Sequence, residues 1–318
     1  MRTARLLVVL LSLTLGVLLA ACQQAGESDI GRTNEGVMRL GSVEVVDTVA
    51  RAVSLNDRPL VLKGLRGSVR LMGAEQTTAN LTFVRRGRGE SREAGQSVLE
   101  GISITESGTG AKYTYTLAAE KKKYAAVDIR GEVPRSAALR IDRLSGPVRI
   151  DGVRGKLTIE HKHGDVLVLD AAAPVEVTLK NGDVQVGFRT VPEEGPIRLE
   201  TSNGDLRLRL PPNASAQIDA QTDAGTIRTQ NLSFATERFV PVNAGARYNA
   251  QLGEGGPTIE LRTQNGSITI QARDSARADT MAATQTPAPD TTVSPRPASD
   301  TQRVDTLTAD TTASDTSS

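Results

Sequence analysis

The chain has 318 residues, with 38 Lys and Arg against 37 Asp and Glu and a formal net charge of +1 at pH 7. Without its two polar or signal-like ends the chain keeps roughly 235 residues, enough for one large domain or two small ones. The balanced charge argues against a nucleic-acid partner. Aromatic residues make up only 3% of the chain, and tryptophan is absent. Compact enzymes rarely have so few aromatic residues, whereas a narrow interior of Val, Ile and Leu needs none.

The first 22 residues are organised like a bacterial lipoprotein signal. Two arginines near the start precede an apolar run over residues 6–19, and Ala20 and Ala21 stand directly before Cys22. Because this run is shorter than the roughly 20 residues of a membrane span, it indicates a signal peptide over residues 1–21. The sequence Leu19-Ala20-Ala21-Cys22 resembles a lipobox, which implies cleavage before Cys22 and acylation of its thiol. The alternative is an ordinary signal peptide that ends near a cysteine.

Lipidation would make a membrane the first partner of the protein. Cys22 is the single cysteine, so no disulfide can form within the chain, and acylation would explain the lone thiol. Several acyl chains hold a protein to a bilayer firmly, and the polar residues 22–36 are expected to form a flexible tether. Gln23 resembles the sorting residue of outer-membrane lipoproteins, which implies an outer-membrane location on either the periplasmic or the surface-exposed face.

Residues 274–318 are rich in Thr, Asp, Ser, Ala and Pro. Such a segment cannot bury enough apolar surface to offset its ordering entropy, so it is expected to be disordered. Asp-Thr pairs recur in it at Asp279, Asp290, Asp305 and Asp310. They resemble acceptor sites for bacterial O-glycosylation, although a solvated polar tail would have the same composition.

A short phrase repeats through the middle of the chain, in which a glycine is followed by alternating apolar and polar residues. The glycines Gly164, Gly182, Gly204 and Gly225 are 18, 22 and 21 residues apart, and Gly266 follows after 41. Alternation of this kind predicts strands with one buried face, and β-branched residues favour them. Second strands are expected between the phrases, over residues 175–179, 197–199 and 259–261.

Two strands and two corners in each unit predict an all-β fold, a β-solenoid or β-roll of stacked coils of ~18–22 residues. A β-sandwich would also give short strands between turns, but it does not require the same residues at the same place in each unit. The domain is expected over residues 37–273. Within it, residues 37–133 are expected to form irregular first coils, with residues 85–88 and 121–123 as exposed turns.

The sequence resembles the DUF4097 family of bacterial β-strand-repeat proteins, also described as adhesin-like. The resemblance is carried by Gly67-Ser68-Val69-Arg70-Leu71, by residues 129–141, and by Asn203-Gly204-Asp205-Leu206-Arg207-Leu208. It implies display and contact at the cell envelope, with no catalytic residue and no cofactor. The sequence also has no phosphate-binding loop, no Gly-x-Ser-x-Gly elbow and no His-Glu-x-x-His.

Two groups of residues are candidates for metal binding. Asp165, Asp183 and Asp205 occupy equivalent places in the repeat, so their carboxylates could bind Ca²⁺ or could accept hydrogen bonds from the turn backbone. His161 and His163 would share one face of a strand but have no obvious third ligand. We expect both groups to serve the turns and therefore expect no metal.

Outward-facing basic residues are the remaining candidates. The solenoid would align some of them into stripes that could bind an anionic envelope polymer or surface ligand. The alternative is a solvated face on which glutamates neutralise the basic groups. We therefore expect a non-catalytic adhesin-like or structural role; a periplasm-facing accessory protein and a polysaccharide-acting enzyme remain alternatives. The candidate stripe comprises Arg198, Arg207, Arg209, Arg228 and Arg262, with Arg149, Lys156 and Lys180 also facing outward.

Overall fold

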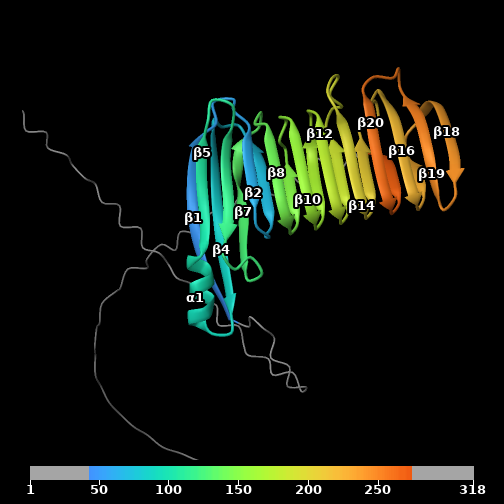
Figure 1. Ribbon diagram of the computed structural model, residues 1–318. Helices are drawn as coiled ribbons and strands as arrows, with labels where there is room; N and C mark the ends of the chain where they lie inside the picture. Colours follow the sequence, from blue (N-terminus) through green and yellow to red (C-terminus); the bar gives the residue numbers. More distant parts are fainter. Residues whose placement is uncertain (1–42, 274–318) are drawn as a thin grey trace, which may run out of the picture. The chain divides into compact units, whose positions relative to one another are not determined.

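The computed structural model describes residues 43–273, which form two large β-sheets and one helix (Figure 1). We call the ten-stranded sheet sheet A and the eleven-stranded sheet sheet B. The predicted all-β solenoid is confirmed. Over the described residues no helix has the length and apolarity needed to cross a membrane. Cys22, the expected tether and the expected disordered tail lie outside the described residues.

The middle of the chain winds in regular coils, each of which contributes one strand to each sheet. Neighbouring coils pair in parallel and in register, so that Val177 on β12 lies opposite Ile159 on β10 and Leu199 on β14. The strands of these coils are β8 (Leu139–Ser145), β9 (Val148–Asp151), β10 (Leu157–His163), β11 (Val166–Ala171), β12 (Val175–Asn181), β13 (Val184–Phe188), β14 (Ile197–Asn203) and β15 (Leu206–Leu210).

The alternating pattern places the core between the two sheets. On β15, Leu206, Leu208 and Leu210 are buried, whereas Arg207 between them is exposed. Each coil adds a similar set of aliphatic side chains to one continuous cluster. Since a single coil cannot bury its own apolar face, stacking is what makes the core.

The first strands do not stack in chain order. The coil of β2 and β3 lies directly against β8 and β9, and later strands extend both sheets beyond it. The pairs β1–β4, β4–β7 and β5–β6 are antiparallel. These elements are β1 (Val43–Ser54), β2 (Leu60–Gly64), β3 (Val69–Ala74), β4 (Thr78–Gly89), α1 (Arg92–Glu100), β5 (Ile102–Gly108), β6 (Tyr113–Ala119) and β7 (Ala125–Pro134).

Two features of this part differ from the sequence predictions. Residues 85–88 are not an exposed turn but lie within β4, because Arg85 and Arg86 pair with carboxylates of β1. The helix α1 was not predicted; Ser91 caps it by accepting a hydrogen bond from the backbone N–H of Ala94, and Val98 and Leu99 are buried. Residues 121–123 form a turn, as expected.

The last coil is also out of order. The chain first forms β16 and β17, then the antiparallel strands β18 and β19, and finally returns to place β20 and β21 between earlier coils (Figure 1). The 41-residue gap between Gly225 and Gly266 therefore contains four strands, from β17 to β20. These strands are β16 (Ala216–Ala224), β17 (Ile227–Gln230), β18 (Phe234–Val242), β19 (Gly245–Leu252), β20 (Thr258–Asn265) and β21 (Ile268–Ala272).

The turn glycines are stacked along one corner of the solenoid. A Cβ atom on Gly182 would lie 2.5 Å from the carbonyl oxygen of Gly164 in the preceding coil, and φ of Gly182 is +136°. Glycine is therefore required for two reasons: its backbone angle is positive, and the neighbouring coil leaves no room for a side chain. The stacked glycines are Gly67, Gly146, Gly164, Gly182, Gly204, Gly266 and Gly225, in spatial order.

A buried polar side chain accompanies most of these glycines. The hydroxyl of Thr263 donates to the carbonyl oxygen of Gly204 at 3.0 Å, and Thr201 donates to Gly182 at 3.1 Å. In each case the polar side chain belongs to the neighbouring coil. It stands three residues before the turn glycine of that coil. These bonds satisfy carbonyl groups that the stacked corner removes from water.

Candidate ligand-binding face

A line of arginines crosses the outer face of sheet A. Arg70 on β3 lies opposite Arg130 on β7 and opposite Arg149 on β9, so that three arginines stand on adjacent strands. The same register continues through Leu167 and Gln185 to Arg207, and then through Thr269 to Arg228. All five arginines are exposed. We call Arg130, Arg70, Arg149, Arg207 and Arg228 the arginine row.

The arginine row is hardly neutralised by the protein. Arg149 reaches Asp151, with 3.4 Å between Nη2 and Oδ2. Within residues 43–273, no carboxylate oxygen lies within 4.0 Å of the other four guanidinium groups. Like charges directly opposite each other on neighbouring strands are destabilising. The protein thus carries repulsion here that its own side chains do not relieve.

The outer face of sheet B has the opposite organisation. Several of its basic groups pair with carboxylates on neighbouring strands, as Lys156 does with Glu176 at 2.7 Å and Arg198 with Glu260 at 2.9 Å. Among the described residues, the exposed Lys180 has no such partner. Arg262 lies 2.6 Å from Asp219, and this hydrogen bond raises the pKa of Arg262 above its ordinary value. Ion pairs neutralise these basic groups, as the solvated-face alternative predicts.

The expected stripe therefore separates into two groups. Arg207 and Arg228 belong to the arginine row, and Arg209 lies two residues further along β15, where it faces the side-chain amide of Gln185. Arg198 and Arg262 lie on sheet B and are ion-paired.

Sequence reasoning missed Arg70 and Arg130 as members of such a row. Val69-Arg70-Leu71 repeats the pattern of Val148-Arg149-Ile150, and this likeness was an available signal for Arg70. Arg130 joins the row only because β7 pairs with β3, and the sequence did not reveal that pairing.

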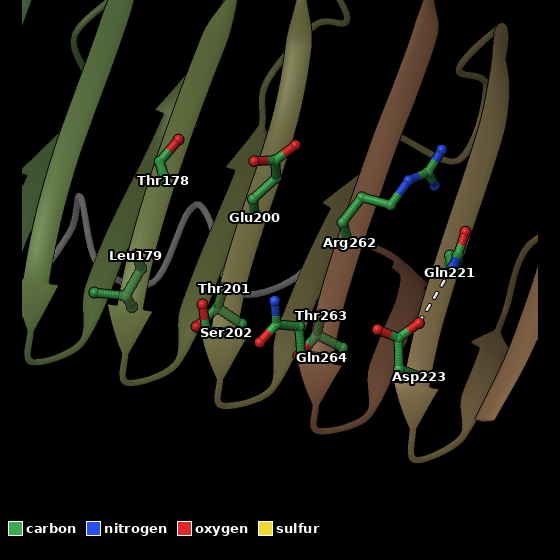
Figure 2. Close-up of a pocket in the computed structure, with 10 residues that line it drawn as sticks. All are labelled: Thr178, Leu179, Glu200, Thr201, Ser202, Gln221, Asp223, Arg262, Thr263 and Gln264. Carbon is green, nitrogen blue, oxygen red and sulfur yellow. Dashed lines mark hydrogen bonds between the residues drawn. The ribbon is translucent and has the colours of Figure 1, made fainter. Parts of the chain in front are cut away.

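A shallow hollow of about 270 Å³ lies on sheet B around Arg262 (Figure 2). Figure 2 shows Glu200, Arg262, Gln221 and Asp223 on adjacent strands, with Gln221 donating to Asp223 at 3.2 Å. Asp219 holds the Arg262 guanidinium with contacts of 2.6 and 3.1 Å. The charged groups Arg262 and Asp223 at this hollow are therefore already hydrogen-bonded within the protein.

The aspartates of the repeat hold the turns. Oδ1 of Asp165 accepts the backbone N–H of Asp183 at 3.0 Å, and Oδ1 of Asp183 accepts that of Asp205 at 2.9 Å. Each carboxylate thus bonds the turn of the next coil rather than its own turn. Over residues 43–273, no cluster of three or more His, Cys, Asp or Glu residues could hold a metal ion.

The two histidines have separate surroundings. His161 is 4% exposed, and its Nε2 lies 2.7 Å from the carbonyl oxygen of Gly146. Burial lowers the pKa of His161 below its ordinary value. His163 is exposed and contacts Asn181 at 3.1 Å. Arg143, in register beside His161, is also buried, and burial lowers its pKa to about 10.

The family of the repeat region follows from its sequence. Residues 121–271 match the family model described as Toastrack DUF4097. These residues belong to the DUF4097 family. None of the curated proteins compared with the chain matches it. The DUF4097 region contains four arginines of the row, and Arg70 lies before it on the strand between β7 and β9.

Among the solved structures similar to this chain are three bacterial proteins. A candidate cell adhesion protein from Clostridium sporogenes shares 14% identity, with a TM-score of 0.41, over 72% of this chain and 100% of its own. A candidate adhesin from Bacteroides fragilis shares 12% identity over 71% and 97%, with a TM-score of 0.24. A candidate lipid binding protein from Parabacteroides distasonis shares 9% identity over 71% and 97%, also at 0.24.

Proposed function

We propose that this DUF4097 chain is a lipid-anchored, non-catalytic binding module of the cell envelope with an adhesin-like or structural role. The lipobox-like sequence Leu19-Ala20-Ala21-Cys22 supports the anchor, and Gln23 supports an outer-membrane location. In this proposal the acyl chains hold the protein at the membrane, and the solenoid presents its outer faces to a partner.

One observation carries the binding role. The arginine row sets five exposed arginines in one register across sheet A, and only Arg149 has a carboxylate partner within the described strands. The other sheet shows that this fold can pair its outward charges. A row left without partners therefore favours an external anionic ligand over a purely solvated face.

Acylation is tested by growing cells with an alkyne-bearing palmitate and detecting label on the protein. The wild-type protein should take up the label and sediment with membranes. The variant Cys22→Ser should do neither. Label on the variant would contradict acylation of Cys22.

The binding role is tested by co-sedimentation of the purified mature protein, held in nanodiscs of neutral lipid, with envelope fractions of the native bacterium. Saturable binding at low salt that falls at high salt supports the role. Failure to bind any fraction would contradict it. Labelling of intact cells with a reagent that cannot cross membranes then distinguishes surface display from a periplasmic position.

A further inference from the structure

We propose that the arginine row binds a linear polyanion, an acidic polysaccharide chain that lies across the strands of sheet A along the stacking direction. The inference rests on the proposed binding role and names the chemistry of its partner. The bound groups would be carboxylates or other anions spaced along the chain. The partner is thus identified by charge and shape.

The spacing of the row fits a repeating polymer. Adjacent strands lie about 4.8 Å apart, so Arg130, Arg70 and Arg149 present charges at this interval. That interval is close to the length of one sugar residue in an extended polysaccharide. From Arg130 to Arg228 the row crosses seven strand intervals, or about 34 Å. A chain of about seven sugar residues would therefore span it.

The row is narrow, which favours a linear ligand over a membrane. On one side lie the exposed carboxylates of Asp165, Asp183 and Asp205. On the other side lie Glu132 and Asp151. A broad anionic surface would meet these carboxylates and be repelled, whereas a single chain can follow the arginines between them.

The composition of the face also argues for an acidic polysaccharide over a nucleic acid. The remaining positions in the register of the row are Leu167, Gln185 and Thr269, which are uncharged. No described aromatic side chain lies in the row, so bases would find no surface on which to stack. Arginine can bind a carboxylate through two parallel N–H groups, which suits isolated anionic groups along a chain.

The test measures binding of an oligogalacturonate of about ten residues by calorimetry, with the mature protein in nanodiscs of neutral lipid. The triple variant Arg70→Gln/Arg130→Gln/Arg149→Gln should weaken binding about tenfold, equivalent to about 1.4 kcal/mol. The matched control Arg140→Gln/Arg198→Gln/Arg262→Gln loses the same charge from sheet B and should change binding less than twofold. Thermal melting of both variants establishes that they fold.

Binding should weaken with added salt, since the screening length falls from about 10 Å at 0.1 M to about 3 Å at 1 M. Equal weakening by both triple variants would overturn the proposal, as would absence of binding. Tighter binding to phosphatidylglycerol vesicles or to single-stranded DNA would also overturn it. If the row variant still co-sediments with envelope fractions as the wild type does, the binding role stands and the arginine row is not its site.

Discussion

The stacked glycines of the corner should tolerate no side chain, and Gly182 allows the cost to be worked out. A Cβ atom there would lie 2.5 Å from the Gly164 carbonyl oxygen and 2.8 Å from its carbon, whereas real Cβ contacts begin at 3.0 Å. The backbone angle φ of +136° adds about 1–3 kcal/mol of strain for a residue with a side chain. Displacing the neighbouring strand costs a similar amount, as overpacking does. We expect Gly182→Ala to lower the free energy of unfolding by about 3 kcal/mol.

Gly187 on the adjacent strand is the matched control. A Cβ atom there would meet Arg209 at 3.8 Å and Val168 at 3.9 Å, which are ordinary contacts. Gly187→Ala should therefore be neutral or raise stability by up to about 1 kcal/mol.

Urea unfolding followed by circular dichroism, in a common Cys22→Ser background, measures both changes. For a domain of this size, the loss at Gly182 corresponds to a fall in Tm of about 6–12 °C. If Gly182→Ala loses less than about 1 kcal/mol, or no more than Gly187→Ala, the account of the corner is wrong.

Three further predictions concern buried and exposed polar groups. Thr263→Val should lower the free energy of unfolding by about 1–2 kcal/mol, because it leaves the Gly204 carbonyl without a donor; unchanged stability in urea would contradict this. Because burial lowers the pKa of His161, the unfolded chain takes up a proton near its ordinary pKa of 6.5 while the folded protein resists it, so stability should fall as the pH drops below about 6.5. In the His161→Thr variant the free energy of unfolding should fall less between pH 7 and 5 than in the wild type. If urea unfolding shows the same pH dependence for both proteins, another group is responsible. Without ligand, Arg70→Gln should raise the free energy of unfolding by about 0.2–1 kcal/mol, because it removes repulsion from Arg130 and Arg149. The control Arg198→Gln breaks an ion pair and should not raise it. Equal changes in urea unfolding for the two variants would contradict repulsion within the row.

Much of the fold follows from local sequence. Strand positions such as β12 and β14 were predicted from alternation, and the corners from their glycines. The order of the coils was not predictable in this way, because each coil presents the same spacing of apolar residues to either neighbour. The helix α1 was missed because its apolar signal, chiefly Val98 and Leu99, is short.

The arginine row was only partly predictable for the same reason. Alternation within a strand shows that Arg207 faces outward, but it cannot say which residue stands beside it. Arg70 and Arg130 are far apart in the chain and become neighbours because β7 lies beside β3. The buried role of His161 could have been read from Thr201 and Thr263, which also stand three residues before a turn glycine.

The out-of-order strands at both ends have a consequence for how this domain can change length in evolution. At one end β20 and β21 are enclosed by β14 and β16 and by β15 and β17, and at the other end the coil of β2 and β3 is enclosed in the same manner. If a coil were duplicated at either end of the domain sequence, its strands would find no exposed edge of a parallel coil to pair with, because the neighbouring coil is already paired on both sides. New coils can enter only between β8 and β15, where chain order and spatial order agree. Relatives with longer or shorter solenoids should therefore differ in the number of central coils and keep both ends.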